Sequence, residues 1–180
     1  MKFSDIFTSK DKIQLDKKTL VILRWIAIFG QYFSINFVYF ILNFELPFFY
    51  CNLIVIIGIS TNLYLQFAIK ENQLSNIKSF FYLLYDVIQL SILLFLTGGV
   101  TNPFIILLII PTIVSSTFLN LKSTINLLVI TIVILIILTF FYFPLPYLDE
   151  LHFHVPNYYL YAIPLAIIIG LVFLTYFGVR

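Results

Sequence analysis

Long runs of apolar residues, separated by short polar breaks, extend through almost the whole chain. A helix that crosses a membrane needs about 20 mostly apolar residues. Six runs approach or meet this length, and the breaks between them contain Pro, Gly, Asn and Lys, which favour turns and loops. We therefore predict an all-α polytopic membrane protein with six transmembrane helices, at about residues 19–42, 48–69, 79–97, 103–119, 124–143 and 158–178.

The composition supports this class. Of the 180 residues, 62% are hydrophobic and 10% are charged, and the mean hydropathy is +1.07. A soluble domain of this length has too little interior to bury so much apolar surface. We expect the lipid bilayer as the surrounding medium and no nucleic-acid partner. The single cysteine, Cys51, excludes an internal disulfide, and we interpret it as a small buried hydrophobe.

The positive charges indicate the orientation of the spans. Five lysines precede the first span within residues 1–18, two lie between spans two and three, one lies between spans four and five, and Arg180 follows the sixth. The loops at the opposite ends hold Glu45, Asp149 and Glu150 and neither Lys nor Arg. Since loops rich in Lys and Arg stay in the cytoplasm, we predict that both termini are cytoplasmic, with residues 1–18 as a cytoplasmic segment.

Two ionisable residues lie inside predicted spans, where charge is costly and marks a functional or structural role. Arg24 and Asp86 lie at similar depths from the cytoplasmic ends of spans one and three and carry opposite charges. We predict an interhelical ion pair. The alternative is that Arg24 extends to the lipid phosphates while Asp86 forms hydrogen bonds by itself.

Uncharged polar residues also lie in the first three spans. Gln31 falls near the middle of span one, and Gln89 shares a helix face with Asp86. They form either hydrogen bonds between helices or a polar pocket shared by spans one to three, together with Asn36, Asn62 and Ser91.

Pro111 interrupts span four, and we expect a kink there. The hydroxyl side chains that follow it either satisfy the opened backbone or face a ligand; they are Thr112, Ser115, Ser116 and Thr117. His152 and His154 lie near two acids in the outer loop, and we interpret that loop as solvated rather than metal-binding. We therefore expect no metal site.

An uncharged octapeptide, Thr-Gly-Gly-Val-Thr-Asn-Pro-Phe at residues 97–104, connects spans three and four. Gly98 and Gly99 can adopt positive φ angles and end span three. Asn102 can cap span four, with Pro103 at its first helical position. A tight turn at the outer face therefore accounts for the special residues of this segment.

The same residues carry a resemblance to a known family. Leu23-Arg24-Trp25, Gly30-Gln31, Asp86-Val87-Ile88-Gln89-Leu90 and the string from Leu96 to Phe104, followed by Pro111, resemble the membrane sensor region of the RegB/PrrB/ActS redox-responding histidine kinases. The signature Gly-Gly-x-x-Asn-Pro-Phe matches at all its five fixed positions.

This resemblance implies a sensor of the ubiquinone pool in a bacterial inner membrane. The quinone would bind at the positions Gly98, Gly99, Asn102, Pro103 and Phe104. Amide groups at the turn would donate to a quinone carbonyl, and Phe104 would pack against the ring. The resemblance also implies a homodimer and a cognate response regulator.

The kinase region that the resemblance implies is not within these 180 residues. We therefore expect residues 19–180 to be the sensor portion of a longer kinase, with ATP bound only in the missing region and no catalytic residue in this portion. Two alternatives stay open. One is a small transporter or channel in which Arg24, Asp86 and Gln89 line a polar path, and the other is a structural subunit of a membrane complex.

Overall fold

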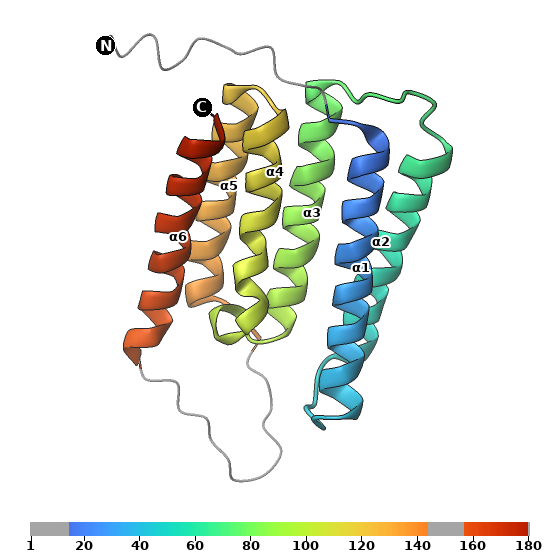
Figure 1. Ribbon diagram of the computed structural model, residues 1–180. Helices are drawn as coiled ribbons and strands as arrows, with labels where there is room; N and C mark the ends of the chain where they lie inside the picture. Colours follow the sequence, from blue (N-terminus) through green and yellow to red (C-terminus); the bar gives the residue numbers. More distant parts are fainter. Residues whose placement is uncertain (1–14, 144–156, 180) are drawn as a thin grey trace, which may run out of the picture.

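The computed structural model describes residues 15–143 and 157–179. The regular elements of these residues are helices that run side by side as a bundle (Figure 1), which confirms the all-α class. Their bounds are α1 (Lys17–Phe40), α2 (Phe48–Phe67), α3 (Asn76–Leu96), the 3₁₀ helices η2 (Gly99–Thr101) and η3 (Pro103–Leu108), α4 (Ile109–Phe118), α5 (Leu121–Phe140) and α6 (Asn157–Val179).

Three helices begin two or three residues earlier than the apolar runs predict, because polar side chains cap them. Asp16, Ser75 and Asn120 each have extended backbone, and each side chain accepts a hydrogen bond from the backbone N–H three residues later. Such caps satisfy amide groups that the first helical turn leaves without partners. A hydropathy pattern begins at the first apolar run and therefore misses the polar first turn.

Five of the helices, α1, α2, α3, α5 and α6, are long and apolar enough to cross a membrane. The fourth predicted span is shorter, covering Pro103–Phe118. It is also not one regular helix, since it begins as the 3₁₀ helix η3 and becomes the α-helix α4 at Ile109. Pro111 lies in the first turn of α4, where a missing N–H is tolerated. The kink expected at Pro111 stays a prediction, and what the structure shows is a change in helix type just ahead of the proline.

The exposed surface of the described residues is rich in large apolar side chains. Phe67 is 74% exposed, Phe33 67% and Ile26 65%. The buried core is also apolar, and Leu65, Leu127 and Leu135 are among its fully enclosed members. A soluble protein rarely exposes so large an apolar surface. The protein therefore has the character of a helical bundle surrounded by lipid.

The bundle has two parts. Helices α1 and α2 form a close antiparallel pair, and α3 to α6 pack together beside them. The beginning of α1 and the end of α6 lie at the same end of the bundle, together with the loops that hold Lys70 and Lys122 (Figure 1). The hairpin between α3 and η3 lies at the opposite end.

A candidate ligand pocket between α1, α3 and α4

The hairpin after α3 is held by the side chain of Asn102. Its Oδ1 accepts a hydrogen bond from Phe104 N at 2.9 Å, and its Nδ2 donates to both Thr97 O (3.0 Å) and Thr97 Oγ1 (2.7 Å). The predicted cap, with Pro103 at the helix start, is confirmed. The role of Thr97 was not predicted. Both amide hydrogens of Asn102 are used inside the turn.

Both glycines of the hairpin adopt positive φ angles as predicted, 103° at Gly98 and 57° at Gly99. Gly99 meets a second requirement that the sequence did not reveal. A Cβ at this position would lie 2.5 Å from Tyr142 Cβ and 2.9 Å from the carbonyl oxygen of Leu138. The turn is therefore packed against the end of α5, and Gly99 permits that close approach.

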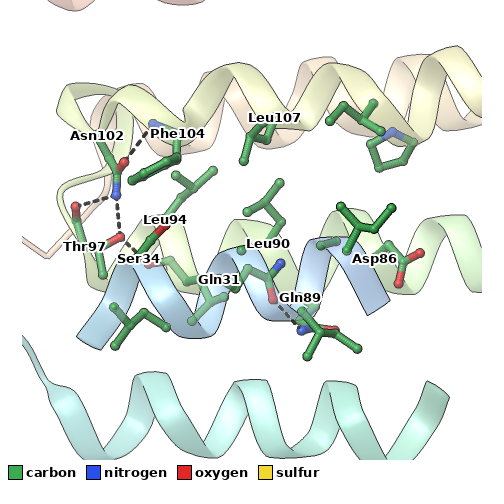
Figure 2. Close-up of a pocket in the computed structure, with 18 of the residues that line it drawn as sticks. Gln31, Ser34, Asp86, Gln89, Leu90, Leu94, Thr97, Asn102, Phe104 and Leu107 are labelled. Atoms are coloured by element: carbon green, nitrogen blue, oxygen red, sulfur yellow. Dashed lines mark hydrogen bonds between the residues drawn. The ribbon is translucent and has the colours of Figure 1, made fainter. Parts of the chain in front are cut away.

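A cavity of about 640 Å³ lies between α1 on one side and η3 and α4 on the other, and α3 lines it between them (Figure 2). Its walls are mostly apolar, with Leu90, Leu94 and Leu107 pointing into it. Its volume falls in the range of small-molecule sites. The polar residues on its lining are Arg24, Gln31, Ser34, Asp86, Gln89, Thr97, Thr101 and Asn102.

The structure divides the five positions of the predicted quinone site. Asn102, Pro103 and Phe104 line the cavity at its hairpin end. Gly98 and Gly99 are not among the lining residues, and Gly99 faces α5 instead. Within this arrangement the two glycines shape the turn, while Asn102, Pro103 and Phe104 face the cavity.

The ion pair predicted between spans one and three is present. Arg24 Nε lies 2.9 Å from Asp86 Oδ1, and the Arg24 side chain is 3% exposed. Arg24 Nη2 donates to Thr61 Oγ1 on α2 at 2.9 Å. The guanidinium carbon lies 5.4 Å and 5.2 Å from the ring centroids of Tyr82 and Tyr85, within cation–π range. Arg24 is thus enclosed by groups from α2 and α3, and it does not extend toward lipid phosphates.

Arg24 Nη1 is buried and has no hydrogen-bond acceptor among the described residues. The aromatic rings beside the guanidinium compensate part of the cost of burying the charge. Neither Thr61 nor the two tyrosines was singled out from the sequence. The helical spacing of Tyr82 and Asp86, four residues apart, is a signal that could have placed that ring next to Arg24.

A second polar contact links the same two helices deeper along the cavity. Gln89 Nε2 donates to Gln31 Oε1 at 3.0 Å, and Figure 2 shows the two side chains pointing toward one another. Gln89 is also packed tightly against α2, since a Cβ at Gly58 would lie 2.5 Å from Gln89 Nε2. The hydrogen bond between helices is therefore confirmed for this pair. The pair also lines a pocket, but that pocket is formed by α1, α3 and α4 and not by spans one to three as the alternative had it.

The other polar residues of the first three spans behave differently. Asn62 Nδ2 donates to the carbonyl oxygen of Val21 and so connects α2 to α1. Asn36 and Ser91 donate to carbonyl oxygens of their own helices. None of the three is among the residues that line the cavity.

The hydroxyl side chains after Pro111 do not line the cavity either. Ser115 Oγ donates to Thr124 Oγ1 at 3.2 Å, and Thr112 Oγ1 lies 3.4 Å from Thr131 Oγ1, so these two connect α4 to α5. Ser116 and Thr117 both donate to the carbonyl oxygen of Ile113. Pro111 itself lines the cavity.

Cys51 is fully buried among apolar side chains, as predicted. No group of three metal-binding side chains occurs within residues 15–143 and 157–179. The segment with Asp149, Glu150, His152 and His154 lies outside the described residues.

Comparison with curated proteins relates the chain to the sensor histidine kinase RegB of Cereibacter sphaeroides, to which it is 35% identical over 164 residues. The match covers 91% of this chain and 36% of the relative, so the chain spans about a third of the relative's length. No protein-family model matches the chain, and no solved structure matches it.

Proposed function

The chain belongs to the RegB-type sensor family, and we propose that it is the membrane input domain of a two-component sensor histidine kinase in a bacterial inner membrane. The ligand that we assign to it is ubiquinone, bound in the cavity between α1, α3 and α4. The single observation that carries this assignment is that the Asn102-Pro103-Phe104 part of the hairpin lines a large apolar cavity.

The chemistry of the cavity suits a quinone. A quinone combines a flat ring, two carbonyl acceptors and a long isoprenoid tail. Apolar walls from α1, α3 and η3 accommodate the ring and the tail, and a few polar groups can orient the carbonyls. Since Arg24 and Asp86 neutralise one another, the cavity does not require a charged ligand.

The same pairing argues against the transporter or channel alternative. A hydrated path needs polar groups that remain available to the permeating species. Here Arg24 and Asp86 bind to one another, and Gln89 is held by Gln31 and Gly58. The rest of the lining is mostly apolar, which favours a binding pocket over a path.

For the topology we propose six membrane crossings, with the N-terminus and the C-terminus of the chain both in the cytoplasm. Although Pro103–Phe118 is short, a 3₁₀ helix rises about 2.0 Å per residue and an α-helix about 1.5 Å. Its six 3₁₀ residues and ten α-helical residues therefore extend about 27 Å, close to the roughly 30 Å of the hydrocarbon core.

The output of the sensor would leave through α6. This helix ends at the proposed cytoplasmic end of the bundle and packs along α4 and α5. A ligand that favours one arrangement of the helices shifts the population of that arrangement by its difference in affinity. The kinase region of the whole protein, acting as a homodimer, would pass the change to its response regulator.

Quinone binding can be tested with the chain in lipid nanodiscs, using the short-tailed ubiquinone-1 and empty nanodiscs as the baseline. We expect saturable binding that Phe104→Ala weakens about tenfold, because burial of the Phe104 side chain against the ligand in the cavity contributes about 1–2 kcal/mol. Phe67→Ala removes the same side chain from a surface position outside the cavity and should leave the affinity unchanged. Equal affinity in wild type and Phe104→Ala would contradict the assignment.

A further inference from the structure

The cavity contains a hydrogen-bond donor that has no partner within the described residues. Gln31 Oε1 accepts from Gln89 Nε2, which turns Gln31 Nε2 away from Gln89 (Figure 2). This amide nitrogen carries two hydrogens and makes no hydrogen bond to residues 15–143 or 157–179. Ser34, one turn further along α1, also lines the cavity with a hydroxyl that has no such bond.

The hairpin, by contrast, has little left to offer a ligand carbonyl. Both amide hydrogens of Asn102 go to Thr97. Thr101 Oγ1 donates to the carbonyl oxygen of Gly98 at 2.7 Å, and Thr97 Oγ1 donates to the carbonyl oxygen of Leu93 at 2.7 Å. The polar side chains at this end of the cavity are therefore committed to the turn and to α3.

We propose that the ligand's head group binds against α1, with a carbonyl oxygen accepting a hydrogen bond from Gln31 Nε2 and with Ser34 beside it. This inference rests on the proposed function. Gln89 lies seven residues before the end of α3 at Leu96, so the head group lies about 10 Å deeper in the membrane than the hairpin. The hairpin then closes the end of the cavity rather than binding the carbonyl.

The orientation of Gln31 is fixed from behind by two other helices. Gln89 on α3 donates to Gln31, and the backbone of α2 at Gly58 confines Gln89. A half-buried amide held in this way keeps its donor side directed at the cavity, which reduces the ordering cost of binding. Gly58 and Gln89 are thus positioning residues for Gln31.

This placement connects the oxidation state of the ligand to the packing of α1 against α3. A quinone carbonyl accepts from Gln31 Nε2 and leaves the Gln31–Gln89 hydrogen bond in place. A quinol hydroxyl carries a hydrogen that needs an acceptor, and Gln31 Oε1 offers its second lone pair beside the one that accepts from Gln89. The quinol would then share the oxygen through which Gln89 holds α1 to α3, whereas the quinone leaves that oxygen to Gln89 alone.

The test uses the chain in nanodiscs with ubiquinone-1 labelled with ¹³C at its carbonyls. Difference infrared spectroscopy then reports the carbonyl stretching band of the bound quinone. In wild type the band should lie at lower frequency than for ubiquinone-1 in lipid alone. In Gln31→Met it should return to the lipid value, and binding should weaken about threefold to tenfold, the effect of one hydrogen bond.

Asn36→Leu is the matched control, because Asn36 lies on the same helix outside the cavity and bonds only to its own backbone. This variant should leave the carbonyl band and the affinity for ubiquinone-1 unchanged. Gln31→Asn keeps an amide on a shorter side chain and serves as the second variant in case Gln31→Met does not fold. It too should shift the carbonyl band from its wild-type position and weaken binding.

The outcomes separate the two proposals. If wild type shows no saturable binding, the proposed function fails and this inference fails with it. If ubiquinone-1 binds and Phe104→Ala weakens it, but neither Gln31 variant changes the band or the affinity, the head group lies elsewhere and this inference alone is overturned.

Discussion

At the scale of single residues, Arg24 joins three helices. It belongs to α1, its ion-pair partner Asp86 belongs to α3, and Thr61, which accepts from Nη2, belongs to α2. The Thr61 hydroxyl in turn donates to the carbonyl oxygen of Gly58. A buried charge in apolar surroundings is costly when its partner is removed. The pair therefore ties the α1–α2 hairpin to the remaining helices.

We predict strong coupling between Arg24 and Asp86. Arg24→Ala and Asp86→Ala should each lower the free energy of unfolding by about 3–5 kcal/mol, because each leaves an unpaired charge. The double variant should lose less than the sum, by about 1–3 kcal/mol. Loss of helical circular dichroism during titration with denaturing detergent measures these values.

The exposed ion pair Lys78–Glu71 provides the control for this comparison of single and double variants. Its atoms are also close, at 2.6 Å, but the side chains are 45% and 53% exposed. Such pairs contribute about 0–1 kcal/mol. Additive effects of Arg24→Ala and Asp86→Ala would contradict a stabilising ion pair in the folded protein.

At the scale of elements, the connection from α3 to α4 is the most constrained part of the chain. Two residues with positive φ end α3, a single asparagine side chain caps the start of η3 and bonds back to Thr97, and the turn packs against Tyr142 after α5. Phe143 N also donates to the carbonyl oxygen of Phe95 at 2.7 Å. The end of α5 and the end of α3 are therefore held together at the hairpin.

We predict that Gly99→Ala destabilises the protein by roughly 1–3 kcal/mol. The added Cβ meets Tyr142 and the Leu138 carbonyl, and φ of 57° is strained for alanine. Gly30→Ala is the matched control, since a Cβ there meets nothing within 4 Å and its position is helical. It should be neutral or stabilising by up to about 1 kcal/mol.

Unfolding in denaturing detergent compares the two alanine variants directly. Equal stabilities for Gly99→Ala and Gly30→Ala would show that the hairpin does not require the close approach to α5.

At the scale of the whole molecule, the lysines of the described residues lie together at one end of the bundle. Lys17, Lys70, Lys78 and Lys122 lie at the end of the bundle where α1 begins and α6 ends, while Glu45 lies at the other end. On the positive-inside rule we propose that the lysine-bearing end is cytoplasmic. The number of crossings decides whether the loop with Lys70 and the loop with Lys122 share a side of the membrane.

We predict that the loop with Lys70 and the loop with Lys122 lie on the same side of the membrane, and cysteine labelling checks this prediction. In a Cys51→Ser background, Lys70→Cys, Lys122→Cys and Glu45→Cys each place one thiol at an exposed position. A membrane-impermeant maleimide added to intact spheroplasts should label only the Glu45 variant, and all three variants after permeabilisation. Labelling of the Lys122 variant in intact spheroplasts would mean that Pro103–Phe118 does not cross.

Much of the element pattern follows from the sequence because it depends on local chemistry. Apolar length marks the long helices, glycine and asparagine mark the hairpin, and the matching depths of Arg24 and Asp86 predict their contact. Helix starts were displaced only where polar caps precede the apolar run. The location of the donor at Gln31 was harder to predict, since its availability depends on which way Gln89 turns.

What the sequence determined by itself is therefore the all-α membrane class, the turn at Gly98-Gly99 and its cap at Asn102. Only the tertiary structure decided which faces meet. Helices such as α5 and α6 are apolar on every side, because lipid is as apolar as a protein core, so hydropathy does not distinguish a buried face from an exposed one. For that reason the cavity beside α1, the packing of Gly99 on Tyr142 and the link from Gly58 through Gln89 to Gln31 came from the fold alone.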